Sequence, residues 1–341
     1  MRYSIPSEMQ ALEIPKLYKD INEAVSSLKV VSKLVPHPKH GQVLVKIEAA
    51  PCNPSDLLFI QGRYNIQKKF PTTPGWEGAG TVVASGGGLY ANFLVGKRVA
   101  CSGILSGTWS QYCLSDASSC IPLKPSISFE QGATLLINPF SAYGMLEKAK
   151  NEGHAAIVQT AAASQLGRIL LTLADEENIP VINIVRRVEQ EDLLLKSGAK
   201  FVLNSENPLF LDLLKQYSHD LKATIAFDAV AGQMTGTLFT ALPPNSTVVV
   251  YGTLSMSPCE IATRQLIGEN KKLEGFLLSN WVRSHNLWSL YRASTYLQGL
   301  MGQGRLKTTI RKTVNLNEAP NAILEYQKEM TSGKIIICPQ N

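Results

Sequence analysis

Short apolar runs alternate with segments of helical periodicity through the second half of this chain. The runs lie at residues 155–159, 180–185, 200–204, 224–230 and 246–252. A strand–helix alternation of this kind predicts a parallel sheet with helices packed on both of its faces. Leu273–Leu278 is a candidate sixth strand, and residues 284–303 have the periodicity of one long helix.

The stretch His154–Ala174 has the pattern that opens a dinucleotide-binding βαβ unit. A strand-like run, Ala155–Val158, leads through small residues into leucines and an isoleucine at helical spacing. The free N–H groups and partial positive charge of such a helix N-terminus suit a pyrophosphate. A second run, Val181–Val185, follows and ends in two arginines. The pattern therefore predicts a dinucleotide site and, with it, an oxidoreductase.

The first third of the chain has the pattern of a β-rich domain. Gln42–Ala49 alternates apolar and polar residues, as a half-buried strand does. Further short strand candidates lie at residues 80–84, 97–101 and 107–114. The glycine run at 85–88 is not followed by a helical pattern, so we interpret it as a turn between strands rather than a phosphate loop.

Helix and strand signals in the remaining segments indicate how the two patterns join. Residues 128–149 have helical periodicity interrupted by Asn138-Pro139, which predicts one helix before the proline and a second beyond it. The tail returns to a β-type pattern that could rejoin the first domain. We therefore predict a β-rich domain over 1–135 and 308–341, and a nucleotide-binding domain over 136–307.

Composition and charge exclude several classes of protein. The 341 residues carry 33 basic and 27 acidic side chains without a dense basic run, which argues against nucleic-acid binding. No apolar run reaches the roughly 18 residues of a transmembrane helix, and the N-terminus lacks a secretion signal. The six cysteines form no Cys-x-x-Cys pair, which favours a reducing compartment, the cytoplasm or the mitochondrial matrix.

Seven short motifs, read in order, point to one family. They are NPSD at 53–56, GRY at 62–64, PGWEGAG at 74–80, INPFSAY at 137–143, the turn at 161–167, YG at 251–252 and GFLLSNW at 275–281. Together they resemble the zinc-independent branch of the medium-chain dehydrogenase/reductase superfamily. The nearest groups are the quinone oxidoreductases and the mitochondrial-type 2-enoyl thioester reductases. The resemblance implies an α/β protein, with a β-rich GroES-like catalytic domain and a doubly wound Rossmann domain.

The same comparison argues against a metal site. Zinc-dependent relatives have a cysteine near position 53 and Gly-His-Glu where this chain has Gly75-Trp76-Glu77. Asn53 and Trp76 stand in those places, and neither side chain is a plausible zinc ligand. The five histidines are dispersed along the chain. We therefore expect no bound metal.

The candidate catalytic residues are Tyr64 and Asn53. In the enoyl reductases the tyrosine that matches Tyr64 lies beside the nicotinamide, and a phenol with a pKa near ~10 can donate a proton at neutral pH. A structural tyrosine on a turn is the alternative. Asn53 and Asp56 are expected to orient this loop through side-chain-to-backbone bonds. Trp281 resembles a tryptophan of the acyl pocket, with core packing as the alternative.

The cofactor turn departs from the superfamily pattern Ala-x-x-Gly-x-x-Gly. In this chain the turn is Ala-Ala-Ala-Ser-Gln-Leu-Gly, and the residues assigned to the cofactor are Ala161, Ser164, Gln165, Leu166 and Gly167. A serine replaces the first glycine, and Gln165 stands where close relatives have a glycine. A side chain there could crowd the pyrophosphate, since glycine is used where backbone approaches a ligand. Gly167 remains for close packing of helix on strand.

The arginines after the second strand predict which cofactor binds. An acidic residue there would accept a bond from the ribose 2′-hydroxyl, whereas arginine pairs with a 2′-phosphate. Arg186 and Arg187 therefore favour NADPH over NADH, the alternative being a solvated basic pair. The resemblance adds Ser141, Tyr251, Gly252 and Leu278 to the cofactor cleft.

These observations predict an NADPH-dependent, zinc-free reductase that transfers hydride to a quinone, an enone or an enoyl thioester. The protein would supply position and polarisation, and the cofactor the hydride. Relatives of this branch often pair the last strand of the cofactor sheet, which implies a homodimer through Leu273–Leu278. Gln165 leaves open a second class, a non-catalytic or weakly active NADPH-binding subunit of a larger assembly.

Overall fold

The chain folds into two units. The computed structural model describes residues 3–64, 66 and 68–341, and the first unit comprises the residues up to Ile137 together with Ser294–Asn341. The second unit is Asn138–Ala293. The division near 137 lies close to the sequence-based boundary, but residues 294–307, assigned by sequence to the nucleotide-binding domain, belong to the first unit.

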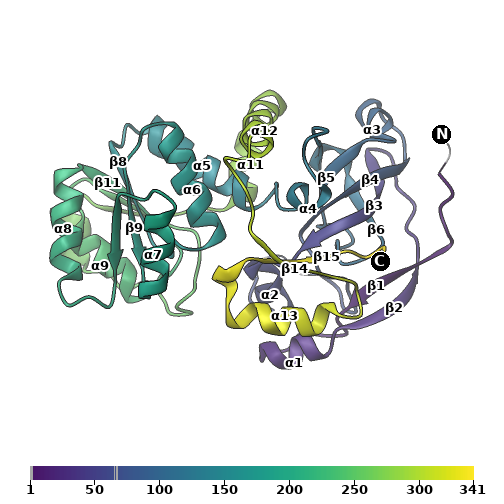
Figure 1. Ribbon diagram of the computed structural model, residues 1–341, viewed down its shortest axis with the longest axis horizontal. Helices are drawn as coiled ribbons and strands as arrows, with labels where there is room; N and C mark the ends of the chain where they lie inside the picture. Colours follow the sequence, from purple (N-terminus) through teal and green to yellow (C-terminus); the bar gives the residue numbers. More distant parts are fainter. Residues whose placement is uncertain (1–2, 65, 67) are drawn as a thin grey trace. The chain divides into compact units, whose positions relative to one another are not determined.

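The first unit is built on antiparallel strands (Figure 1). Its strands are β1 (Glu8–Glu13), β2 (Lys29–Leu34), β3 (Gln42–Pro51), β4 (Glu77–Ser85), β5 (Arg98–Ser102), β6 (Tyr112–Asp116), β7 (Cys120–Pro122), β14 (Ile310–Val314) and β15 (Lys334–Ile337). Its helices are α1 (Ile21–Ser26), α2 (Pro54–Ile60), α3 (Leu89–Leu94), α4 (Phe129–Gly132) and α13 (Ala319–Lys328), with 3₁₀ turns η1 (Ala117–Ser119) and η2 (Met330–Ser332). The larger sheet has the order β14-β15-β3-β4-β5-β7, and β6 pairs with β3.

The C-terminal segment is an integral part of this first unit. β15 pairs antiparallel with β3 and parallel with β14, so residues from both ends of the chain share one sheet. Tyr326 of α13 and Trp109 are among its largest fully buried side chains. The indole N–H of Trp109 donates to the carbonyl of Pro51 over 3.1 Å, which satisfies the one polar atom of that ring in the core.

The second unit is a six-stranded parallel sheet with the order β10-β9-β8-β11-β12-β13. Its strands are β8 (Ala156–Gln159), β9 (Val181–Val185), β10 (Phe201–Asn204), β11 (Ala223–Asp228), β12 (Thr247–Val250) and β13 (Lys272–Gly275). Its helices are α5 (Asn138–Asn151), α6 (Gln165–Glu176), α7 (Val188–Lys196), α8 (Phe210–Asp220), α9 (Gln233–Ala241), α10 (Thr263–Gly268) and α11 (Leu278–Ser284), and α12 (Leu287–Gly302) begins here. Figure 1 shows α8 and α9 on one face of the sheet and α5, α6 and α7 on the other. The α/β fold class predicted from the sequence is confirmed.

Three local predictions were wrong or incomplete. The glycine run at 85–88 is followed directly by helix α3, which the sequence reading missed because only six residues are helical. The strand predicted over 107–114 begins only at Tyr112. The candidate strand Leu273–Leu278 ends at Gly275, and Leu278 begins α11 instead.

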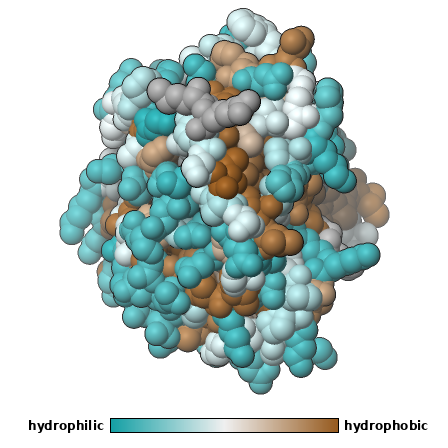
Figure 2. Space-filling model, turned by 90° about the vertical axis from the view of Figure 1, so that its right-hand side faces the viewer, coloured by the Kyte–Doolittle hydropathy of each residue, from teal (hydrophilic) through white to brown (hydrophobic). Residues whose placement is uncertain are grey.

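Several large hydrophobic side chains are exposed on the surface. The face in Figure 2, which views the molecule from the side of β1, β2 and α3, is mostly hydrophilic with separate brown patches. Helix α3, for example, exposes Leu89, Tyr90 and Phe93. None of the described helices is both long and apolar enough to cross a lipid bilayer.

Candidate active site

The predicted cofactor residues of the second unit gather at the carboxyl edge of its sheet. The turn at 161–167 follows β8, the two arginines follow β9, and Tyr251 and Gly252 follow β12. Strand β8 is central, and the chain winds from it first to β9 and later to β11 on the other side. Ligands of such sheets bind outside the carboxyl ends of the strands at this reversal.

The turn after β8 is shaped by close backbone approach. Ser164 caps α6, since its hydroxyl accepts a bond from the N–H of Gly167 over 3.1 Å. A Cβ at Gly167 would lie 2.5 Å from the carbonyl oxygen of Ala162, so only glycine fits there. Ala161 has a φ of +49°, a conformation that glycine usually supplies. The capped helix N-terminus and this turn have the form of a phosphate-binding element.

Gln165 does not simply project from the turn. Its side-chain oxygen accepts a bond from the guanidinium of Arg168, one helical turn along α6, over 3.1 Å, and the residue is 8% exposed. The side chain therefore lies against α6 itself. Burial lowers the pKa of Arg168, and its Nε has no partner among the described residues. The predicted crowding of a pyrophosphate by Gln165 is not required by this geometry.

Arg186 and Arg187 are exposed at the end of β9. The side-chain oxygen of Gln190 accepts bonds from both backbone N–H groups, over 3.2 and 3.3 Å, and so fixes the backbone from which the arginines project. Within the described part of the chain neither guanidinium has an ion-pair partner. Both are therefore available to an anionic ligand.

Tyr251 and Gly252 lie beside a buried aspartate at the end of β11. The carboxylate of Asp228 accepts bonds from the hydroxyls of Thr160 and Thr235, each over 2.8 Å. The Tyr251 hydroxyl is buried and without a hydrogen-bond partner among the described residues, and burial, aided by Asp228, raises its pKa. A Cβ at Gly252 would lie 2.7 Å from the carbonyl oxygen of Ala229. Gly252 is therefore needed for the close passage of two strand ends.

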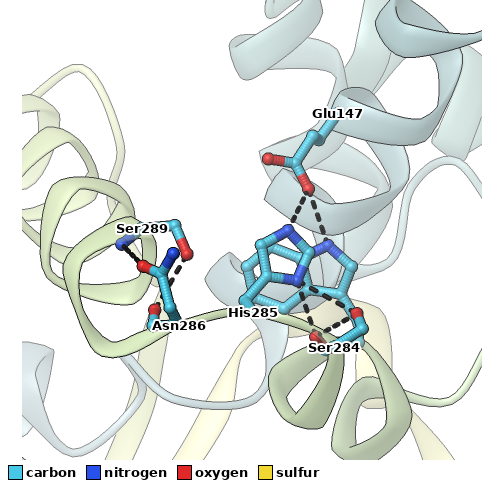
Figure 3. Close-up of polar contacts among 6 residues, drawn as sticks. Glu147, Ser284, His285, Asn286 and Ser289 are labelled. Carbon is cyan, nitrogen blue, oxygen red and sulfur yellow. Dashed lines mark hydrogen bonds and ion pairs between the residues drawn. The ribbon is translucent and has the colours of Figure 1, made fainter.

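Ser141, Leu278 and Trp281 also belong to the second unit. Ser141 is buried on α5, and Leu278 opens α11. Trp281 of α11 packs edge-on against Phe140 and Tyr143, with ring centres 6.2 and 6.0 Å apart. This region includes His285 and Glu147, which face each other in Figure 3.

Asn53 lies in the first unit, in a buried polar network. It is 1% exposed and precedes α2, and its N–H donates to the carboxylate of Asp56 over 2.8 Å. Its side-chain N–H₂ donates to Glu77 over 2.9 Å, and its side-chain oxygen accepts a bond from Lys334 over 2.5 Å. Asn53 therefore links an ammonium to a carboxylate, and both polar atoms of its side chain have a partner.

Glu77 connects this network to the backbone at the boundary between the two units. Its second carboxylate oxygen accepts bonds from the N–H groups of Leu136 and Ile137, each over 3.0 Å, just where the chain leaves the first unit. Burial raises the pKa of Glu77 to about 7, although Asn53 and Lys334 oppose the shift. Burial likewise raises the pKa of Asp56 to about 7 and lowers that of Lys334. The charge of Lys334 thus acts on both carboxyl groups and opposes the effect of their burial.

Tyr64 lies in the same unit, against Trp76. The two ring centres are 5.4 Å apart, and Lys68 lies over the Trp76 ring at 5.0 Å. Burial raises the pKa of the Tyr64 phenol, and the carboxylate of Asp56 adds to the shift. Tyr64 is therefore protonated at neutral pH. Burial lowers the pKa of Lys68 to about 8, and its ammonium donates to the carbonyl of Gly103 over 3.1 Å.

Sequence reasoning misses several residues in each of the two units. The sequence marks Glu77 only as part of the motif PGWEGAG and gives no role to Lys334, Arg168 or Glu147. Lys334 does give a signal, because it directly precedes three isoleucines in a strand that is buried throughout. A lysine in such a strand needs an anionic or polar partner. Among the described residues no group of three or more histidine, cysteine or carboxylate side chains is arranged to hold a metal.

Two family models match the chain. The model described as "Alcohol dehydrogenase GroES-like domain" matches residues 39–125, and that described as "Zinc-binding dehydrogenase" matches residues 165–293. The first match lies in the unit that carries Tyr64 and Asn53, and the second in the unit that carries the cofactor turn.

Known proteins of similar sequence and structure cover nearly the whole chain. The mitochondrial enoyl-[acyl-carrier-protein] reductase of Arabidopsis thaliana is 32% identical over 81% of this chain and 76% of its own length. That of Rattus norvegicus is 28% identical over 98% and 90%. A crystal structure of a putative NADPH:quinone reductase from Mesorhizobium loti is 37% identical, with a TM-score of 0.90 over 99% of this chain and all of the other.

Proposed function

The chain belongs to the quinone oxidoreductase and enoyl thioester reductase group of the medium-chain dehydrogenase/reductase superfamily, and from this premise we propose that it is an NADPH-dependent reductase of electron-poor double bonds. The main acceptor class is an enoyl thioester, as in the names of the curated relatives. A quinone is the second candidate, favoured by the 37% identical structure from Mesorhizobium loti.

The cofactor assignment is supported by the carboxyl edge of the second unit. The capped N-terminus of α6 fits a pyrophosphate, and the exposed Arg186 and Arg187 fit a 2′-phosphate. The bound cofactor supplies a hydride. Ser141, Tyr251, Gly252 and Leu278 are the further residues that we assign to its site.

Tyr64 is the proposed proton donor. Hydride addition to the β-carbon of an enoyl thioester leaves negative charge on the α-carbon and the carbonyl oxygen, and one proton must follow. A phenol with a raised pKa holds its proton at neutral pH and can donate it when that charge develops. Both polar atoms of the Asn53 side chain already have partners, so we assign it to positioning the loop of Tyr64 rather than to proton transfer.

Zinc has no part in the proposed reaction, despite the description of the second family model. The position of one zinc ligand in the zinc-dependent relatives is taken by Asn53, whose side chain is bonded to an ammonium and a carboxylate. A positively charged Lys334 at this place disfavours a second cation. Metal analysis of purified protein should find no stoichiometric zinc, and about one zinc per chain would contradict the proposal.

A homodimer through β13 is the proposed assembly. This strand is at the edge of the parallel sheet, and Leu273 on it is 38% exposed. An unpaired edge strand leaves backbone N–H and C=O groups that a second copy can pair. Light scattering should give a dimer for the wild type and a monomer for Leu273→Lys; a wild-type monomer at micromolar concentration would contradict it.

Tyr64→Phe tests the proposed reaction. With a short 2-enoyl-CoA and saturating NADPH, the variant should lose about 10²–10⁴-fold in rate, while NADPH affinity barely changes. Tyr18→Phe, which alters another partly buried tyrosine of the same core, is the control. A quinone reductase can take its proton from water, so with an ortho-quinone the loss should be much smaller.

Assays with the two acceptors distinguish the three candidate functions of this chain. Enoyl-CoA reduction that survives Tyr64→Phe intact would remove Tyr64 from the mechanism. Activity with the quinone alone would favour the second candidate. No turnover with either acceptor, together with measurable NADPH binding, would instead favour the alternative of a non-catalytic NADPH-binding member.

A further inference from the structure

Trp281 is held to α5 by a carboxylate and an imidazole. Its indole N–H donates to the carboxylate of Glu147 over 2.8 Å, and its ring lies against that of His285, with ring centres 4.2 Å apart. The Nε2 atom of His285 lies 2.8 Å from the same carboxylate oxygen (Figure 3). We call Glu147, Trp281 and His285 the Trp281 clamp.

The sequence of α5 makes room for this indole. A Cβ at Gly144 would lie 3.1 Å from ring atoms of both Trp281 and Phe276, closer than side-chain packing normally allows. Glycine in the interior of a helix costs roughly 0.5–1 kcal/mol relative to alanine. Its use here, three residues before Glu147, indicates that the helix is shaped to receive the ring.

Both nitrogens of His285 face acceptors. Nδ1 lies 2.7 Å from the carbonyl oxygen of Trp281, which can only accept, so Nδ1 carries a hydrogen. Nε2 faces the Glu147 carboxylate, and a hydrogen bond between these two groups requires a proton on one of them. The imidazole is therefore bonded at both ends, once to the backbone of Trp281 and once to the carboxylate that holds its indole.

Ser284 completes an arrangement that resembles a nucleophilic triad but lacks its chemistry. The Ser284 hydroxyl lies 3.1 Å from Nδ1 of His285, and it donates to the carbonyl of Trp281 over 2.8 Å. Because Nδ1 already carries a hydrogen directed at this carbonyl, it cannot take the proton of the serine. The cluster is built to hold Trp281, not to hydrolyse a substrate.

We propose that Glu147 and His285 are positioning residues that fix the Trp281 indole and thereby limit the length of acceptor that the protein reduces. The inference rests on the proposed function and on the resemblance that assigns Trp281 to the acyl pocket. One carboxylate oxygen receives both the indole N–H and the imidazole. Loss of Glu147 therefore frees Trp281 and His285 together, and the indole can move aside to admit a longer chain.

Glu147→Ala tests the clamp, with Glu147→Gln as its conservative partner. The ratio of kcat/KM for a long over a short 2-enoyl-CoA should rise about tenfold in Glu147→Ala, mainly through KM. Glu147→Gln keeps an oxygen that can accept from the indole and should lie between this variant and the wild type. Glu152→Gln removes an acidic side chain just beyond the same helix and should match the wild type.

Hydrogen exchange of the Trp281 indole N–H gives a readout that needs no activity. Its NMR signal is identified by its loss in Trp281→Phe. Exchange should be faster in Glu147→Ala than in the wild type and Glu152→Gln, because the accepting carboxylate is gone. An unchanged exchange rate would overturn the clamp, and an unchanged chain-length ratio in an active protein would overturn its role in selectivity. A wild type inactive with every acceptor would instead refute the proposed function and with it the selectivity, leaving exchange to decide on the clamp alone.

Discussion

The two groups of candidate site residues are constructed in opposite ways. In the second unit, backbone geometry positions them. They follow strand ends, begin a capped helix, or lie at glycines whose backbone passes close to another segment of the chain. In the first unit, buried side chains position one another, with Asn53 between Lys334 and Glu77. A site made from backbone leaves its side chains free to bind, whereas a site made from side chains uses most of them in holding itself together.

Removal of Lys334 should have the largest effect on stability, because it disrupts the side-chain network of the first unit. Lys334→Met removes a buried ammonium and leaves its acceptors, among them the Asn53 side-chain oxygen, without their donor, which should lower the free energy of unfolding by about 3 kcal/mol. Denaturant unfolding measures it, with Lys312→Met as the control. Lys312 is half-exposed and 3.7 Å from Glu325, so that its loss should cost about 1 kcal/mol or less. Equal losses in the two variants would show that the buried network contributes no more than a surface pair.

Substitution of the exposed arginines of the second unit should change cofactor binding rather than stability. Arg186→Ala combined with Arg187→Ala should reduce the preference for NADPH over NADH by about 1.5–3 kcal/mol, since a charge-assisted contact to the 2′-phosphate is lost. Titration followed by nicotinamide fluorescence measures both affinities. Lys196→Ala, at the end of α7, is the control and should retain the preference. An unchanged ratio in the double variant would refute the assignment.

The pH dependence of stability sharpens the contrast. The pKa values of Asp56 and Glu77 are raised from 3.8 and 4.5 to about 7, so between these values the native chain holds protons that the unfolded chain has released. Their contribution to stability is therefore present below about pH 4 and is lost as the pH rises through 7. The fall should reach about 1.4 kcal/mol per pH unit for each extra proton bound. Denaturant unfolding should show a flatter profile for Glu77→Gln; identical slopes would contradict the shift.

The smallest effect is expected at Gln165. Its side chain lies on Arg168 rather than free in the turn, so Gln165→Ala should change NADPH affinity by less than about threefold, or ~0.7 kcal/mol. A gain of more than tenfold would mean that the glutamine does crowd the pyrophosphate, as the sequence alone suggested.

The sequence predicted the second unit better than the first for a physical reason. The turn at 161–167 and the arginines after Val185 follow from local periodicity, because a parallel sheet brings the carboxyl ends of its strands to one edge. Lys334 and Asn53 are 281 residues apart, and nothing local pairs them. The end of β13 at Gly275 was missed because Phe276, Leu277 and Leu278 are apolar in either a strand or a helix.

The pairing of β15 with β3 has a consequence for the newly made chain. On a ribosome, Asn53 and Glu77 emerge long before Lys334, and the whole of Asn138–Ala293 is synthesised in between. Domains generally fold as units as they emerge. We expect the second unit to fold first, while the earlier segment still lacks β15 and the Lys334 ammonium that donates to Asn53. Arrest of translation just before residue 334 should leave that segment open to proteases and the later one resistant.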